Sequence, residues 1–552
     1  MATENSLNGP PRRILALVTT GGFTHAAPVL EICRVLAGRG HTIEFATCAG
    51  QEGWVADFPV VSRVHSFAEG PSEAECEAHY RRMMAHDPAK GIGPVMKSKY
   101  LWDACWPDVY TRLKGLCGDK TTRPDFIIAD FFIDAAALDM QVEFGVPCAI
   151  VYPQMPFLMA PASYIPGQPG FQVDMTALTS EHASIWARLR NEMVIFWALP
   201  HILPWMRWRN NMRKRLGVKH KVMSGSKPSF LVLVNSFFGL EPPKDLPPLI
   251  AAIGPVLPDA YPHLDDTFSR FMDAHTRTIY IALGTHVILP EKDILKILSG
   301  LVLALDAGHI NGVIWSVAKT PRKEFPASHN LRRANGEELN VGDLLEGKNS
   351  DFLFPLFAPQ RAILDHPHTA LYFTHGGGSS AQEALFHGVR VLTMGIYFDQ
   401  LSNSAKLRTA GVGLSLDKFK FRTDEISSKI GELVDDESGH IGRNVERMKR
   451  IARVASRRKE LAADLVEEVM YDTELRFDEQ GREILPMHLQ TADVRMSAWR
   501  AKNWDLYTLA LSGLILPVLG IMYAQRLWID GGPLGRVVGS ITGSVLELRK
   551  KL

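Results

Sequence analysis

The feature that most constrains the fold is a strand–turn–helix–strand pattern that occurs in two separate stretches of the chain. In the first stretch, the apolar run Ile14–Val18 leads into a turn at Thr19–Gly22, a helix is expected over 29–36, and Thr42–Thr47 is the next strand. Two strands joined through a helix pair in parallel. The first stretch therefore predicts a parallel sheet with helices on its faces.

The pattern continues and then repeats beyond a Pro-rich segment over 241–262. Further strands of the first half are expected at Phe126–Ala129, Cys148–Tyr152 and Phe230–Val234, with a helix over 135–144. In the second half, strands are expected at Thr278–Leu283, Val313–Val317, Leu371–Thr374 and Arg390–Met394, with helices over 294–305, 380–386 and within 423–475. The sequence thus predicts two α/β halves joined by a stiff linker.

Residues 153–210 break this pattern, because they are rich in proline and in large apolar side chains such as Trp186, Phe196 and Trp197. Two interpretations remain open. One is a second layer of helices, the other is an apolar acceptor pocket or a membrane-contacting surface, and the two are compatible with each other.

Composition excludes several classes of protein. The chain has 552 residues, of which 46% are hydrophobic, so a disordered or fibrous protein is excluded. Its 61 Lys and Arg balance 60 Asp and Glu, and the net charge of +1 argues against nucleic acid as a partner. Six cysteines lie in the first 150 residues without a C-x-x-C pair, which favours reduced thiols in the cytosol over zinc ligands and leaves disulfides open.

The two ends of the chain differ. The polar N-terminus leads directly into the first strand, so we expect no secretory signal. Leu506–Ala524 is an uncharged apolar run with Trp504 and Trp528 near its ends, which is typical of a membrane-spanning helix. The alternative is a buried core helix interrupted by Pro517.

The segment from Phe357 to Gln400 carries the strongest functional signal. A predicted strand ends at Thr374, the turn His375–Gly378 follows, and a helix begins near Ser379. Glycines let a ligand approach the backbone, and the free N–H groups of a helix N-terminus stabilise an anion such as a pyrophosphate. His375 and Ser380 can add side-chain donors, and Glu383 can accept hydrogen bonds from ribose hydroxyls.

The flanks of this turn also suit a nucleotide sugar. Phe357 offers a flat face for a nucleobase, and Gln360 can hydrogen-bond a base edge. Asp399 and Gln400 follow a strand, at the edge where parallel sheets place ligand contacts, and their side chains suit sugar hydroxyls.

This segment resembles the donor-binding signature of the family 1 UDP-dependent glycosyltransferases. The matching residues are Phe357, Pro359-Gln360, Leu364-Asp365-His366-Pro367, Thr374-His375-Gly376-Gly377, Ser380, Glu383 and Asp399-Gln400, with the family's intervals throughout. Phe357 replaces the family's usual Trp, and Gly378-Ser379 replaces a more common pair ending in Asn.

The resemblance covers about residues 12–470 and implies the α/β GT-B fold, with two Rossmann-like domains facing a cleft. The domains expected on this basis are an N-terminal acceptor domain at 12–240, a linker at 241–270, a C-terminal donor domain at 271–475, a connecting segment at 476–503, a transmembrane helix at 504–528 and a tail at 529–552. The family's phosphate-contacting turn corresponds to Gly284-Thr285, so Thr285 joins the expected donor residues together with Gly376, Gly377, Gly378 and Ser379.

The resemblance also assigns a catalytic pair. His25 lies in a turn similar to the family's His-x-x-Pro, in which the histidine is the base, although Thr24 replaces the usual glycine. Asp130 resembles the aspartate that holds this histidine. A histidine with a pKa near neutrality can remove the proton of an acceptor hydroxyl, and a carboxylate on its other nitrogen fixes the tautomer.

The sequence therefore predicts an inverting transferase that moves a sugar, expected to be glucose, from a UDP-sugar to a lipophilic hydroxylated small molecule. No Asp-x-Asp motif occurs, so neither a metal nor another cofactor is expected. The alternatives are a transferase for membrane lipids or sterols, and a non-catalytic binding protein. A dehydrogenase is disfavoured because G-x-G-x-x-G is absent after the first strand. The C-terminal run and the terminal Arg549–Leu552 predict an anchor in the endoplasmic reticulum with the catalytic domains facing the cytosol.

Overall fold

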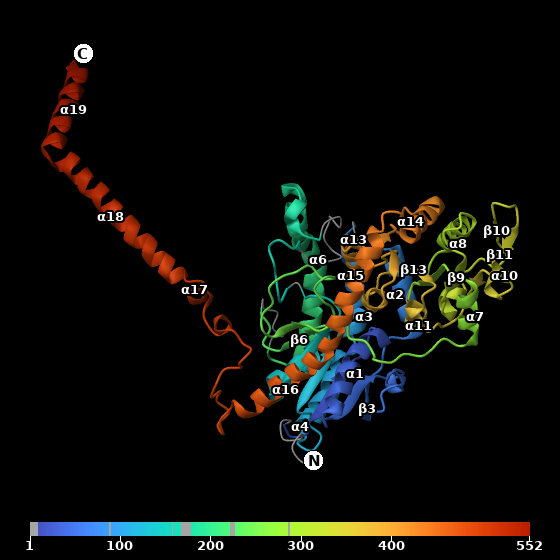
Figure 1. Ribbon diagram of the computed structural model, residues 1–552. Coiled ribbons are helices and arrows are strands. Elements are labelled where there is room, and N and C mark those ends of the chain that lie inside the picture. Colours follow the sequence, from blue (N-terminus) through green and yellow to red (C-terminus); the bar gives the residue numbers. More distant parts are fainter. Residues whose placement is uncertain are drawn as a thin grey trace. The chain divides into compact units, whose positions relative to one another are not determined.

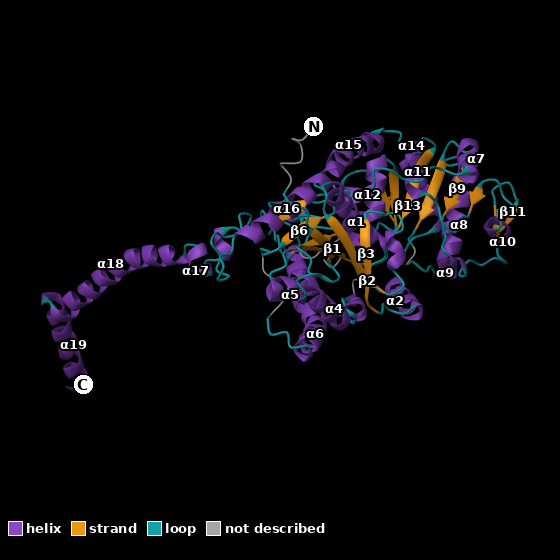
Figure 2. Cartoon of the chain, turned by 90° about the horizontal axis from the view of Figure 1, so that it is seen from below, coloured by secondary structure: helices purple, strands orange, loops and turns teal. Residues whose placement is uncertain are grey.

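The computed structural model describes residues 9–87, 90–156, 158–166, 178–220, 227–284 and 287–551. The chain forms two compact units, Met1–Met487 and His488–Leu552. In the first unit, the described strands form two parallel sheets and one small antiparallel hairpin. Figure 2 shows the two groups of strands in orange, each covered by helices.

The first sheet contains seven described strands in the order β3-β2-β1-β4-β5-β6-β7. They are β1 (Arg13–Leu17), β2 (Thr42–Cys48), β3 (Val61–Ala68), β4 (Phe126–Asp130), β5 (Cys148–Tyr152), β6 (Leu231–Val234) and β7 (Ile250–Ala252). The chain winds outward from β1 to β3 and then returns to β4 on the other side of β1. The strand order therefore reverses between β1 and β4, which is where open α/β sheets hold their ligands.

The second sheet contains six described strands in the order β12-β9-β8-β13-β14-β15 and reverses between β8 and β13. They are β8 (Thr278–Ala282), β9 (Gly312–Trp315), β12 (Phe352–Leu353), β13 (Thr369–Thr374), β14 (Arg390–Thr393) and β15 (Gly413–Ser415), and the hairpin is β10 (Asn330–Arg332) with β11 (Glu338–Asn340). The prediction of two Rossmann-like parallel sheets is confirmed.

The described α-helices of the first unit pack on the faces and edges of these sheets. They are α1 (Phe23–Gly38), α2 (Glu73–Ala85), α3 (Gly93–Asp103), α4 (Trp106–Gly118), α5 (Asp134–Phe144), α6 (Ile185–Arg215), α7 (Asp266–Ala274), α8 (Glu291–Asp306), α9 (Lys319–Arg322), α10 (Val341–Leu345), α11 (Gln360–Asp365), α12 (Gly378–His387), α13 (Asp399–Thr409), α14 (Thr423–Asp435), α15 (His440–Ala455) and α16 (Lys459–Leu475).

The core lies on both faces of each sheet, because successive strand residues point to opposite sides. On β8, Ile279 and Ile281 pack with Leu298 of α8, whereas Tyr280 packs on the other face with Leu385 of α12. Strands buried on both faces are apolar throughout, which is why these strands are recognisable in the sequence.

Two elements do not follow the domain limits expected from the sequence. β7 lies inside 241–270, which we expected to be linker, and pairs with β6 in the first sheet. α16 lies inside 271–475 but returns to the first half, where Glu467 Oε1 is 2.9 Å from His41 Nε2, just after α1. Figure 1 shows α16 running beside α1. The proline-rich flanks hide β7, and a charged helix does not reveal its partner in the sequence.

Most of α6, a helix of 31 residues with Pro200 and Pro204 inside it, lies in the segment 153–210, which breaks the strand–helix pattern of the sequence. One face of α6 turns inward with Asn191 and Ala198 buried, whereas Trp186, Phe196 and Trp197 are exposed. The helical interpretation is confirmed for 185–215. Residue 157 and residues 167–177 lie outside the described part of the chain.

The second unit contains α17 (Ala498–Ala501), α18 (Trp504–Gly531) and α19 (Pro533–Lys551). Within α18, Trp504–Ile529 has a mean hydropathy of 1.8, and none of its most apolar window is buried. Among the described residues, this is the one helix with the length and composition to cross a membrane. α19 lies within the C-terminal tail expected at 529–552.

Candidate active site

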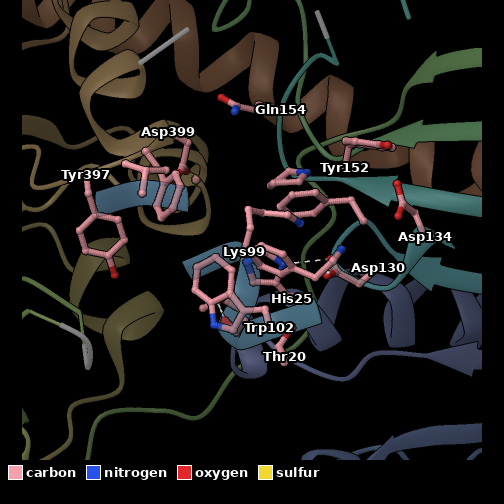
Figure 3. Close-up of a pocket in the computed structure, with 18 of the residues that line it drawn as sticks. Thr20, His25, Lys99, Trp102, Asp130, Asp134, Tyr152, Gln154, Tyr397 and Asp399 are labelled. Carbon is pink, nitrogen blue, oxygen red and sulfur yellow. Dashed lines mark hydrogen bonds and ion pairs between the residues drawn. The ribbon is translucent and has the colours of Figure 1, made fainter. Parts of the chain in front are cut away.

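The two predicted catalytic residues meet where the first sheet reverses. His25 lies in the first turn of α1, directly after β1, and Asp130 is the last residue of the adjacent β4. His25 Nδ1 is 2.9 Å from Asp130 Oδ2. Figure 3 marks this contact with a dashed line. Asp130 Oδ1 accepts a hydrogen bond of 3.1 Å from the N–H of Phe132, which fixes the carboxylate. With Nδ1 engaged, Nε2 is the imidazole nitrogen left for a ligand.

The surroundings of His25 favour its charged form. Burial disfavours a charge on the ring, but the carboxylate of Asp130, with a smaller contribution from Asp399, outweighs burial and raises the pKa of His25 above its usual value. The rings of Phe131 and Phe132 lie 5.6 and 5.0 Å from the imidazole and hold it in place.

The turn before His25 requires glycine. Gly21 has a φ of +91°, and a Cβ atom on it would lie 2.5 Å from Cδ2 of His25. The ring therefore packs directly on the backbone of the turn, and any side chain at Gly21 would displace it.

A second glycine turn lies where the second sheet reverses. His375 follows β13, and its ring is enclosed by two glycines: a Cβ atom would lie 2.9 Å from Cε1 at Gly284 and 2.6 Å from Nε2 at Gly377. α12 begins immediately afterwards at Gly378, so the first N–H groups of this helix point out of the turn. An anion bound here would meet both these N–H groups and the imidazole.

Both turns open into one cavity of about 840 Å³. The predicted site residues that line it are His25, Asp130, His375, Gly377, Gly378, Ser379, Ser380, Asp399 and Gln400. The structure thus brings the catalytic pair of the first half and the glycine turn of the second half to the same space. Thr285 lies outside the described residues.

Four other predicted donor residues are not part of the cavity lining. Phe357 is 81% exposed, and the carbonyl of Gly376 accepts a hydrogen bond of 3.0 Å from the side-chain amide of Asn403. Gln360 donates to Glu383 at 2.7 Å and accepts from the hydroxyl of Tyr372 at 3.0 Å. Burial raises the pKa of Glu383 even though the hydrogen bond from Gln360 opposes this. Gln360 and Glu383 therefore bind each other, and their contacts with uracil and ribose remain predictions.

Asp399 and Gln400 stand at the start of α13, after the backbone turn at Phe398, where φ is +50°. Gln400 Oε1 accepts from the N–H groups of Ile396 and Tyr397 at 3.1 and 3.3 Å, so this side chain shapes the loop. Burial raises the pKa of Asp399, and the charge of His25 across the cavity opposes this rise.

Sequence reasoning missed several cavity residues on the acceptor side. They are Lys99, Trp102, Asp134, Tyr152, Gln154, Asn191, Trp205 and Arg209. Tyr152 ends β5 and Asp134 begins α5, so the rule that ligand contacts lie near the carboxyl ends of parallel strands would have pointed to them. Lys99 and Arg209 lie within helices, where no positional signal marks them.

Among the described residues, no group of three or more His, Cys, Asp or Glu side chains could hold a metal ion. The six cysteines are all free thiols, and five of them are buried.

Comparisons with known proteins give the family. The family profile described as UDP-glucoronosyl and UDP-glucosyl transferase matches residues 135–456. A UDP-glycosyltransferase of Talaromyces amestolkiae is 42% identical over 96% of this chain and 100% of its own length. The UDP-glycosyltransferase stmC of Aspergillus ustus is also 42% identical, again over 96% of this chain and 100% of its own length.

Solved structures support the fold. The glycotransferase of kitacinnamycin superposes with a TM-score of 0.59 at 17% identity, over 83% of this chain and 99% of its own. Phytolacca americana UGT2, complexed with UDP-2fluoro-glucose and pterostilbene, superposes with a TM-score of 0.54 at 17% identity, over 83% of this chain and 100% of its own. The GT-B arrangement, the glycine turn at the second reversal and the relatives agree: the chain belongs to the UDP-glucoronosyl and UDP-glucosyl transferase family and is a UDP-glycosyltransferase.

Proposed function

We propose that the protein is an inverting glycosyltransferase that moves glucose from a UDP-sugar to a hydroxyl group of a lipophilic small molecule such as a terpenoid, sterol or phenolic metabolite. The observation that carries this proposal is the shared cavity, in which the His25–Asp130 pair and the His375 glycine turn both take part.

In the proposed reaction, His25 Nε2 removes the proton of the acceptor hydroxyl while Nδ1–H donates to Asp130. The acceptor oxygen attacks the anomeric carbon from the face opposite UDP, and the bond from that carbon to the phosphate oxygen breaks. An α-linked donor then gives a β-glycoside and free UDP. General base catalysis of this kind contributes roughly 10²–10⁴-fold to the rate.

The second half binds the donor in this proposal. His375, Ser379, Ser380 and the backbone of Gly376–Gly378 hold the pyrophosphate and stabilise the negative charge of the leaving group. Thr285, outside the described residues, is the further phosphate contact that the family resemblance implies. Phe357 and Gln360 contact uracil, Glu383 contacts ribose, and Asp399 with Gln400 contacts the sugar. A structural neighbour solved with UDP-2fluoro-glucose supports the choice of glucose.

The decisive test replaces the base. A His25→Ala enzyme should bind UDP as tightly as the unaltered enzyme but lose transfer, because the donor site lies in the other half. Calorimetric titration of UDP and product mass from a panel of UDP-sugars with terpenoid, sterol and phenolic acceptors measure the two properties. Retained turnover would rule out His25 as the base. Hydrolysis of UDP-sugar by the unaltered enzyme would exclude a non-catalytic binding protein.

A second candidate, a transferase for membrane lipids or sterols, is favoured by α6. Trp186, Phe196 and Trp197 on its outward face are 69%, 61% and 55% exposed, whereas Val194, Ala198 and Ile202 line the cavity. A helix with large apolar side chains towards both the cavity and the outside suits an acceptor that arrives from a bilayer. Activity on a sterol that rises strongly when the sterol is presented in phosphatidylcholine vesicles would favour this candidate; equal activity on the dispersed sterol would exclude it.

We also propose that residues 504–528 anchor the enzyme in the membrane of the endoplasmic reticulum, with the catalytic domains on the cytosolic side. The length and apolar composition of α18 support the anchor. The basic end Arg549–Leu552 supports the compartment.

A further inference from the structure

One buried lysine connects the two halves of the enzyme beside the proposed sugar site. Lys418 follows β15 and is only 5% exposed. Its Nζ donates to the carbonyls of Met83 and Met84 at 3.1 and 2.9 Å and to the carbonyl of Ile396 at 2.8 Å. Met83 and Met84 belong to the first half, whereas Ile396 precedes Asp399 and Gln400 in the second.

These three contacts use the full donor capacity of an ammonium group. Burial lowers the pKa of Lys418 to about 8, against the opposing charges of Asp87 and Asp417. At neutral pH the group is therefore still mostly protonated. A buried charge without a directly bound carboxylate is tolerated only when its hydrogen bonds are complete. Here they are complete only while both halves contribute their carbonyls.

The partners in the first half suit a cation. Met83 and Met84 lie in the last turn of α2, whose final carbonyls carry the negative end of its dipole. The Met83 carbonyl also accepts a hydrogen bond of 3.2 Å from the N–H of His86. Their side chains are buried in the core cluster of the second half, together with residues of the second sheet such as Phe373. The end of α2 is thus embedded in the other half.

The partner in the second half is the loop that shapes the sugar site. We call residues 395–398 the donor loop. Its backbone N–H groups at Ile396 and Tyr397 bind Gln400 Oε1, and its carbonyl at Ile396 binds Lys418. The rings of Tyr397 and Phe398 also contact His79 of α2 and Trp102 of α3, with centroids 6.3 and 5.9 Å apart.

We propose that Lys418 is a positioning residue that couples closure of the two halves to the shape of the donor loop, so that Asp399 and Gln400 reach the sugar only in the closed enzyme. The inference rests on the proposed function, which gives Asp399 and Gln400 the sugar contacts. Lys418 itself does not touch the substrate. It holds the donor loop against α2, which also lines the cavity through Cys76 and Tyr80.

The test separates recognition of the sugar from recognition of UDP, using the full chain. Lys418→Met keeps the apolar stem and removes the three donors. We expect kcat/KM with UDP-glucose to fall roughly 10–100-fold, as for a misplaced contact group, while inhibition by UDP stays within about threefold because UDP lacks the glucosyl group that Asp399 and Gln400 are proposed to contact. Lys418→Arg keeps the charge and should recover most of the activity. If Lys418→Met does not fold, Lys418→Gln, which keeps two donors, takes its place.

Two controls match the change. Lys420→Met removes an amine two residues away, where the side chain is 84% exposed. Arg81→Met removes another contact between α2 and the second half, the 2.7 Å ion pair with Glu324. Both should leave kcat/KM unchanged.

Three results would overturn the inference. The first is a Lys418→Met enzyme that melts at a lower temperature but keeps its kcat/KM per folded molecule. Lys418 would then have a purely structural role. The second is an equal loss of UDP and UDP-glucose binding. The third is a normal kcat/KM in Asp399→Ala. That result would show that Asp399 does not contact the sugar, and the inference depends on this contact. A loss in Asp399→Ala without one in Lys418→Met defeats the inference and leaves the proposed function standing.

Discussion

At the scale of residues, the carboxylate of Asp130 determines both the tautomer and the basicity of His25. It binds Nδ1 at 2.9 Å and raises the pKa of the imidazole against the effect of burial. The base must be neutral to accept a proton, so kcat/KM falls on the acid side of this pKa. The position of that acid limb therefore reports the interaction between Asp130 and His25.

Asp130→Asn should lower kcat by roughly 10²–10⁴-fold, because the tautomer is no longer fixed. It should also move the acid limb of kcat/KM to lower pH, since the charge that raises the pKa of His25 is gone. A pH profile of kcat/KM between pH 5 and pH 9 measures the shift. An acid limb at the same pH in both enzymes would contradict the assignment of Asp130.

Gly21 offers a second test of the position of His25. Gly21→Ala places a Cβ atom 2.5 Å from the His25 ring and should lower kcat by about 10²-fold through displacement of the base. Gly50→Ala is the matched control, because Gly50 has a similar φ of +82° with no atom within 4 Å of the added Cβ. Both variants lose about 1–2 kcal/mol to backbone strain. Calorimetry should show a similar loss of stability in the two variants, whereas kcat should fall only in Gly21→Ala. Equal kcat values would contradict the contact between Gly21 and the His25 ring.

At the scale of elements, a buried ion pair fixes the end of α6 that borders the acceptor side. Asp139 of α5 receives two hydrogen bonds of 2.6 Å from Arg213 of α6 and lies 2.7 Å from His220 Nε2. Burial raises the pKa of Asp139 even though both partners oppose it. The carboxylate therefore depends on these two partners to stay charged.

Arg213→Leu should destabilise the first unit by about 3–5 kcal/mol, because it leaves a buried carboxylate unpaired. The double variant Asp139→Leu with Arg213→Leu should recover much of that loss, since no charge remains buried. Arg215→Leu removes an exposed charge on the same helical turn and should change the stability little. Melting temperatures and hydrogen exchange of α6 amides measure the effect. A double variant no more stable than Arg213→Leu would argue against the ion-pair explanation.

At the scale of the whole molecule, the question is whether α18 holds the enzyme in a membrane. Leu514, Leu516 and Leu519 lie within the candidate span, and all three are exposed. Lysine in the middle of a membrane-spanning helix costs about 2.5–3.5 kcal/mol per residue.

The triple variant Leu514→Lys, Leu516→Lys, Leu519→Lys should move the full chain from the alkali-resistant membrane pellet to the soluble fraction. A chain that lacks 504–552 should also be soluble. Leu548→Lys, in α19, is the control and should stay in the pellet. An unaltered chain that is soluble without detergent would contradict the anchor.

Much of the fold was predictable from the sequence, because strands buried on both faces must be apolar and must end in glycine or polar turns. This is why Ile14–Val18 and Leu371–Thr374 were placed correctly to within two residues. β7 was missed because prolines surround its three residues. The role of α16 was missed because its charged surface pairs with the first half through tertiary contacts only.

By itself, the sequence determined the two parallel sheets, the family and the two glycine turns, since these depend on local spacing and on backbone angles that few residues adopt. Only the tertiary structure decided that His25 and His375 share a cavity, that Gln360 and Glu383 bind each other, and that Lys418 joins α2 to the donor loop. Such contacts link residues far apart in the chain, and a side chain's partners depend on the space that the folded elements leave for it.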